Sequence, residues 1–153
     1  MSKKSNVELN QEGENMEHKI KHLEMIMTVI ERMGNNSFLI KGWSITLVSA
    51  IFVVAIQSKE KTFALWTLFP ALIFWLLDAF YVRQERLLRT LYDYVRTINE
   101  KKIDFSMDTS PIVNGHIPSE GTGYFHAVFS RTLLPFHGGL VLAVAVAVFT
   151  FLY

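Results

Sequence analysis

Two apolar runs separated by a short polar tip constrain this chain more than any other feature of its sequence. Residues 36–58 and 62–82 are each mostly apolar, and the tip between them carries Lys59 and Lys61. About 20 residues of α-helix are needed to cross the roughly 30 Å hydrocarbon core of a bilayer. The length and spacing of the two runs therefore predict a transmembrane helical hairpin.

Each run contains one formal charge, Lys41 near the start of the first and Asp78 near the end of the second. Folding the chain back about the polar tip places both residues at the same depth. An ionisable side chain inside a membrane costs about 2.5–3.5 kcal/mol on insertion scales, so a partner is expected. We predict an intramembrane ion pair between Lys41 and Asp78. The alternative is that each side chain extends separately to the membrane surface.

Composition agrees with a membrane protein and excludes several classes of site. Half of the 153 residues are hydrophobic, 13% are aromatic and only 19% are charged, which is typical of a membrane protein. The formal net charge of +1 gives no basic excess for nucleic acid, so no nucleic-acid partner is expected. The absence of cysteine excludes disulfides, thiol nucleophiles and thiolate metal sites.

The amino-terminal part predicts a disordered stretch followed by an amphipathic helix. Residues 1–13 are polar without an apolar period and are expected to be disordered. Over residues 14–34, apolar residues recur at spacings of four and three, which predicts one packing seam along a cytoplasmic helix. Residues 34–37 then combine a helix stop with N-cap candidates, so a break is expected there. The seam consists of Met16, Ile20, Leu23, Met27 and Ile30.

The second membrane run continues into a charged segment with the same period. Residues 83–102 therefore extend that helix out of the membrane, and the two amphipathic segments are expected to pack as an antiparallel stalk, within one subunit or between subunits. Residues 103–123 hold proline and glycine without a period and predict a loop. The seam of the extension consists of Leu88, Leu91, Val95 and Ile98.

Residues 124–153 predict an amphipathic segment leading into a third transmembrane helix. The expected fold class is thus all-α, a multi-pass membrane protein with three transmembrane helices and a cytoplasmic helical stalk. Small residues recur every four positions in the first and third runs, which favours close helix packing or oligomer contacts. These stripes are Gly42, Thr46 and Ala50, and Gly139, Ala143 and Ala147.

The distribution of Lys and Arg predicts the orientation in the membrane. The first 41 residues hold six, the tip at residues 59–61 holds two, and the segment 83–131 holds seven. By the positive-inside rule, the amino terminus, stalk and loop are cytoplasmic, and Tyr153 is outside.

Two pairs of residues are candidates for chemistry. Arg131 and His137 fit the permissive spacing of the RNase-like helical domains called HEPN, with His for proton transfer and Arg for a phosphate. The alternative places His137 in the headgroup region, bonded to a neighbouring helix, with Arg131 on lipid phosphate. His18 and His22 are four apart and present a possible metal-binding face, but a solvated helix face explains them, and neither metal nor cofactor is expected.

The words ERMGNNSFLIKGWSITLVSA and FWLLDAFYVRQERLLRTLYDYVR resemble those of a widespread family of small bacterial membrane proteins. In layout the chain is also similar to the SLATT-type effectors and the octameric RipA-like proteins of bacteria. The resemblance implies an oligomeric protein of the bacterial inner membrane and a membrane-perturbing role in antiviral defence. The fixed points are Asn36, Ser37, Phe38, Lys41, Trp43, Asp78, Arg83, Gln84, Glu85 and Arg86.

The leading functional hypothesis is a non-enzymatic homo-oligomer in the lipid bilayer. Its cytoplasmic part responds to a protein or small-molecule signal, and the membrane assembly then permeabilises the bilayer. The second hypothesis is a structural or adaptor subunit that docks a soluble cytoplasmic protein through the outward residues Glu85, Arg86 and Tyr94. The third is a membrane-bound nuclease that uses Arg131 and His137.

Overall fold

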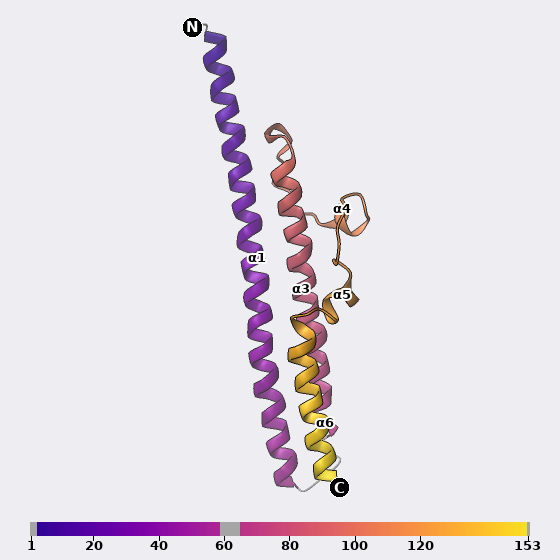
Figure 1. Cartoon of the computed structure of the whole chain (residues 1–153). Coiled ribbons are helices and arrows are strands. Elements are labelled where there is room, and N and C mark those ends of the chain that lie inside the picture. Colours follow the sequence, from indigo (N-terminus) through magenta and orange to yellow (C-terminus); the bar gives the residue numbers. More distant parts are fainter. Residues whose placement is uncertain (1–2, 59–64, 153) are drawn as a thin grey trace. The chain divides into compact units, whose positions relative to one another are not determined.

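The computed structural model describes residues 3–58 and 65–152. Within these residues all regular structure is helical and no strand is formed, so the predicted all-α class is confirmed. Two long helices, α1 (Lys3–Ser58) and α3 (Leu68–Thr97), supply most of it (Figure 1).

The chain divides into two compact units, and α1 and α3 contribute residues to each of them. The first unit consists of Met1–Arg32 and Gln84–Glu120. The second unit consists of Met33–Arg83 and Gly121–Tyr153. Each unit is described separately below.

α1 is one continuous helix, which corrects two expectations. Residues 3–13, expected to be disordered, are helical; they contain no proline, and extending an existing helix costs far less than nucleating one. The break expected at residues 34–37 does not occur. Gly34 costs about 1 kcal/mol relative to alanine in a helix interior, and Ser37 uses its hydroxyl to bond Asp78 rather than to cap a new helix.

α3 begins at Leu68 and ends at Thr97. Pro70 lies in its first turn, where the missing N–H has no intrahelical partner to lose. The helix was expected to reach residue 102. It instead stops before Asn99, whose side chain caps the 3-10 turn η1 (Glu100–Lys102) by accepting from the Lys101 N–H.

One described helix, Asn10–Ser58, is long and apolar enough to cross a membrane, and only 22% of its apolar window is buried within the chain. Leu134–Thr150 is apolar but shorter. The second predicted run includes residues 62–64, and the Lys59 and Lys61 tip precedes them; these positions lie outside the described residues.

In the first unit, the buried face of α1 is rotated by about one residue from the predicted seam. Ile26 is completely buried, and His22 and Ile30 are buried beside it; of these three, Ile30 belongs to the predicted seam. Met16, Ile20 and Met27 are 48%, 49% and 39% exposed, and Leu23 is half-buried. The apolar spacing does not distinguish two neighbouring faces of the helix, because Ile26 and Ile30 lie four residues apart just as Met16 and Ile20 do. The face that includes His22 is the one that packs.

The α3 side of the seam is as predicted, with one addition. Leu88, Leu91 and Val95 are buried and Ile98 is half-buried, while Leu87, which was not predicted, is buried as well. The Lys19 ammonium, 14% exposed, donates to the Ile98 carbonyl at 2.8 Å and lies 3.4 Å from Glu100. These bonds fix α1 against the carboxyl end of α3 in this unit.

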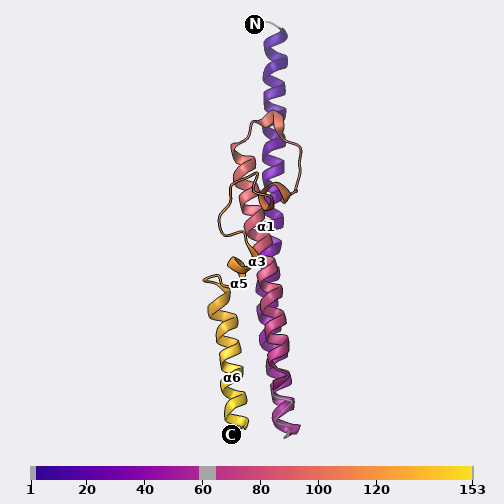
Figure 2. The same ribbon diagram turned by 90° about the vertical axis from the view of Figure 1, so that its right-hand side faces the viewer.

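In the second unit, segments of α1 and α3 pack with α6 (Gly139–Leu152), whose ribbon is seen separately from them in Figure 2. Their shared core is built from Val48, Ala55, Ala71, Val144 and Val148. A second core joins α3 to α5 (Tyr124–Val128) through Ala79, Val82, Ala127, Val128 and Leu133. Small side chains in both cores let the backbones approach closely.

We expect Ile26→Ala to lower the free energy of unfolding by about 2–5 kcal/mol, because it leaves a cavity on a fully buried face. Ile20→Ala, the same change on the exposed face, should stay within about 0.5 kcal/mol. Denaturant titration followed by far-UV circular dichroism measures both. Equal costs at the two positions would show that the exposed face also packs within the chain.

Candidate functional site

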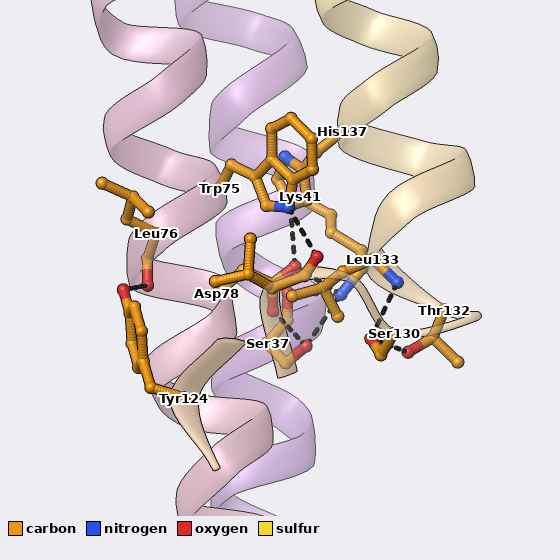
Figure 3. A network of polar contacts seen from close by, with 11 residues as sticks. Ser37, Lys41, Trp75, Leu76, Asp78, Tyr124, Ser130, Thr132, Leu133 and His137 are labelled. Atoms are coloured by element: carbon orange, nitrogen blue, oxygen red, sulfur yellow. Dashed lines mark hydrogen bonds and ion pairs between the residues drawn. The ribbon is translucent and has the colours of Figure 1, made fainter. Parts of the chain in front are cut away.

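A buried carboxylate lies at the centre of the second unit. Asp78 of α3 has no exposed surface, and three side chains converge on it (Figure 3). Ser37 and Lys41 come from α1, and His137 comes from the π-helical turn η2 (Leu134–Gly138) that leads into α6. The site therefore joins three separate segments of the chain.

The bonds to Asp78 are short and use both of its oxygens. Oδ1 accepts from the Ser37 hydroxyl at 2.5 Å. Oδ2 lies 2.6 Å from Lys41 Nζ and 2.8 Å from His137 Nε2. The structure thus brings together Lys41 and Asp78, the pair expected from the sequence, and adds two partners that sequence reasoning did not assign.

Ser37 and Lys41 act as one unit because residues four apart lie on the same helix face. The Ser37 hydroxyl gives its single proton to Asp78 and accepts from Lys41 Nζ at 2.7 Å. The Lys41 side chain remains 22% exposed while Ser37 is buried. The ammonium thus contacts Asp78 and Ser37 together.

A wide helical turn positions His137. A π-helical turn contains one more residue than an α-helical one, and such turns are frequent at functional sites. The His137 ring is fully buried, lies nearly parallel to Trp75 with centroids 6.1 Å apart, and meets the Phe136 ring edge-on at 4.9 Å. Trp75 is itself held by a 3.1 Å bond from its indole N–H to the Val128 carbonyl.

One of the two ring nitrogens of His137 has no hydrogen-bond partner among the described residues. Asp78 accepts from Nε2, so this nitrogen carries a proton. The other ring nitrogen, Nδ1, is buried and has no hydrogen-bond partner among the described residues. It is the one polar atom of this cluster whose hydrogen-bonding capacity is unused.

The contact between these helices depends on the hydrogen bonds of the network being complete. A buried charge costs several kcal/mol to desolvate, and that cost is offset only when its hydrogen bonds are made. Asp78 makes three, two of them to groups that can carry positive charge. Loss of any one donor would leave part of the desolvation cost of Asp78 without compensation and would therefore destabilise the fold.

The nuclease pair is not assembled in the second unit. His137 is buried on Asp78, whereas Arg131 is exposed. Proton transfer onto a phosphate group would need both side chains in one wet cleft. His137 does bond to a neighbouring helix, as the alternative interpretation of this residue expected.

His18 and His22 have different surroundings in the first unit. His18 is exposed and meets the edge of Phe105, with ring centroids 5.7 Å apart. His22 is 1% exposed, and its Nε2 lies 2.9 Å from the Ser106 carbonyl. The expected solvated face therefore applies to His18 and is wrong for His22.

The small-residue stripes do not mediate packing within the chain. Gly42, Thr46, Ala50, Gly139 and Ala143 are exposed, and Ala147 is half-buried. A Cβ added at Gly42 or Gly139 would meet no atom within 4 Å. The α1 face that packs carries Ser37, Ile40, Ser44, Val48 and Ala55 instead.

Of the three outward residues proposed for docking, Tyr94 is the most exposed, at 43%. Glu85 and Arg86 are half-buried. Glu85 is engaged by the Arg89 guanidinium at 2.7 Å. Tyr94 is therefore the residue of the three that presents most surface to a partner.

No family model, no curated protein and no solved structure matches this chain.

A double-mutant cycle tests whether Lys41 and Asp78 stabilise the fold as a unit. Lys41→Met should cost about 3–5 kcal/mol of unfolding free energy because it leaves a buried carboxylate short of its strongest partner. Lys41→Met combined with Asp78→Asn should cost clearly less than the sum of the single changes.

Lys21→Met is the matched control, because Lys21 forms an exposed pair with Glu17 on the same helix. It should cost at most about 0.5 kcal/mol. Additive effects of the Lys41 and Asp78 substitutions would contradict a coupled pair.

Proposed function

We propose that this chain is a non-enzymatic, oligomeric protein of the bacterial inner membrane, and that its oligomer permeabilises the membrane under control of the cytoplasmic part. The observation that carries the membrane assignment is the apolar surface of the second unit. Its large exposed side chains include Phe38, Trp43, Leu47, Val54, Trp66, Phe69, Ile73, Phe80, Leu142, Val146 and Phe149.

This surface has the properties that lipid requires. Monomers in water rarely expose contiguous apolar patches above a few hundred Å². Lys41 and Asp78 are the only Lys, Arg, Asp or Glu residues within 36–58 and 65–82, and each neutralises the other. A pair buried against other helices is how an intramembrane charge is tolerated.

The proposed topology has three spans. The first lies within Asn10–Ser58. The second combines residues 62–67 with the apolar start of α3. The third is Leu134–Thr150, whose length lies at the lower end of the roughly 17–25 residues that cross a bilayer.

Assembly is proposed to use the exposed small residues. Gly42, Thr46 and Ala50 of α1 leave a smooth face that the chain itself does not cover. In lipid, such faces support close helix packing between subunits. Oligomerisation and the defence role also follow from the resemblance to SLATT-type and RipA-like proteins.

Control by the cytoplasmic part is proposed to act on the Asp78 network. The chain passes between the units at residues 32–33, 83–84 and 120–121. Ser37 follows the first of these points by a few residues, and Asp78 precedes the second by a few. A change in the first unit would therefore reach the network through about one helical turn of each helix.

Cross-linking tests the proposed oligomer directly, because the chain has no cysteine. Thr46→Cys should give disulfide-linked dimers in membranes on mild oxidation, since Thr46 lies on the small-residue face. Ile45→Cys has similar depth and exposure but lies about 100° round the helix. It should cross-link several-fold less. Equal or absent cross-linking at both positions would contradict this interface.

Membrane potential tests the proposed activity. Overexpression in bacteria should depolarise the cells, as read by a potential-sensitive dye, and Ala50→Leu should reduce the effect several-fold by blocking close helix approach. Ala145→Leu, the same change at an exposed position off the stripe of α6, should leave it intact. Full polarisation with a correctly assembled oligomer would oppose permeabilisation and favour the adaptor function.

A further inference from the structure

The first unit contains a cavity, and no residue of the Asp78 network lines it. Its volume is about 570 Å³, within the roughly 300–1,000 Å³ range of small-molecule sites. An apolar part of the lining is formed by Leu91 and Val95 of α3 and by Ile98, which directly follows that helix. The segment after η1 contributes further lining residues, including Pro111 and Ile117.

The loop is held over the cavity by α1. Ser106 accepts a bond from His22 through its carbonyl, and Ile112 of the short helix α4 (Ser110–Val113) is 3% exposed. Phe105, with φ of +55°, is the one non-glycine residue of positive φ in the described chain. Such a conformation costs of order 1 kcal/mol or more, and surrounding contacts must maintain it. The ring of Phe105 meets His22, with centroids 5.6 Å apart.

His22 is one of the residues that line this cavity, and it has one unused hydrogen-bond acceptor. A carbonyl only accepts, so the bond to Ser106 requires a proton on Nε2. In the neutral ring, Nδ1 then carries a lone pair. This nitrogen is buried and has no partner within residues 3–58 and 65–152. A ligand that satisfies it must supply an N–H or O–H.

The charged residues that line the cavity favour a cation. Asp104 and Asp108 contribute two carboxylates, while Lys102 is the single lysine or arginine of the lining. Hydrogen bonds from Ser110 hold the pKa of Asp108 below its usual value, so this carboxylate is ionised at neutral pH. The lining therefore combines acceptors and net negative charge with an apolar wall.

We propose that this cavity binds a small organic cation, an amine whose N–H donors meet His22 Nδ1 and the Asp104 and Asp108 carboxylates and whose apolar body lies on Leu91 and Val95. The proposal rests on the proposed function in one respect: it names the chemical class of the signal that the cytoplasmic part would sense. Binding itself requires no membrane activity.

Three probes that share a phenyl ring on a two-carbon chain and differ in charge test the proposal. They are phenethylamine, 2-phenylethanol and phenylacetate. The full chain in nanodiscs is titrated with each, and binding is followed by saturation-transfer NMR, with empty nanodiscs as the correction for partition into lipid. Phenethylamine should bind at least about tenfold more tightly than the alcohol or the acid.

Variants locate the binding site. The double variant Asp104→Asn, Asp108→Asn should weaken phenethylamine binding about tenfold, and Ile117→Trp should weaken it similarly by filling the cavity from the loop side. Asp93→Asn is the matched control, because Asp93 is an exposed carboxylate of α3 that does not line this cavity. It should change nothing. Unchanged circular dichroism spectra and unfolding midpoints would show that each variant is folded.

Absence of saturable phenethylamine binding, equal affinity for the three probes, preference for phenylacetate, or indifference to the Asp104, Asp108 and Ile117 changes would each overturn the proposal. The readouts separate the two hypotheses. Amine binding by a chain that never depolarises cells would refute permeabilisation and leave the ligand site standing. Depolarisation without amine binding would do the reverse.

Discussion

The need to neutralise one buried carboxylate organises the second unit. Asp78 has no exposed surface, and an ionised group in that position is stable only when its bonds are made. Two donors come from α1 and one from the turn that precedes α6. An apolar interface would allow the helices to slide or rotate at small cost, whereas these bonds fix their rotation and depth.

The same constraint explains which faces of the helices pack. Ser37 and Lys41 must face Asp78, so the α1 face that continues with Ser44, Val48 and Ala55 turns inward. Gly42, Thr46 and Ala50 then lie on another face and remain exposed. Within the chain, α1 therefore packs through the face that bonds to Asp78. It does not pack through the small-residue face, which the sequence predicted for close helix packing.

The sequence predicts the class of structure and the Lys41 and Asp78 contact because both follow from length, period and the scarcity of charge in apolar runs. Of the α1 face buried in the first unit it predicts Ile30 but not His22 or Ile26, which lie on a neighbouring face with the same four-residue spacing. Nor does it predict continuous helix at Gly34, where packing outweighs local stop signals.

His137 shows what position along the apolar runs adds to such reasoning. It is the first ionisable residue of the third apolar run, and by the proposed topology that run enters from the same face as Lys41 and Asp78. Counting depth along all three runs would have placed the three residues in one layer. Pairing His137 with nearby Arg131 used distance along the chain, which poorly predicts contact between helices.

The proposed topology would also order the assembly of the site. In the proposed membrane arrangement, the hairpin that carries Lys41 and Asp78 inserts before the third run, and its own pair already offsets the cost of both charges. His137 then arrives at a carboxylate that has two donors. In that order of insertion, His137 adds specificity for the third helix rather than the first neutralisation of the charge.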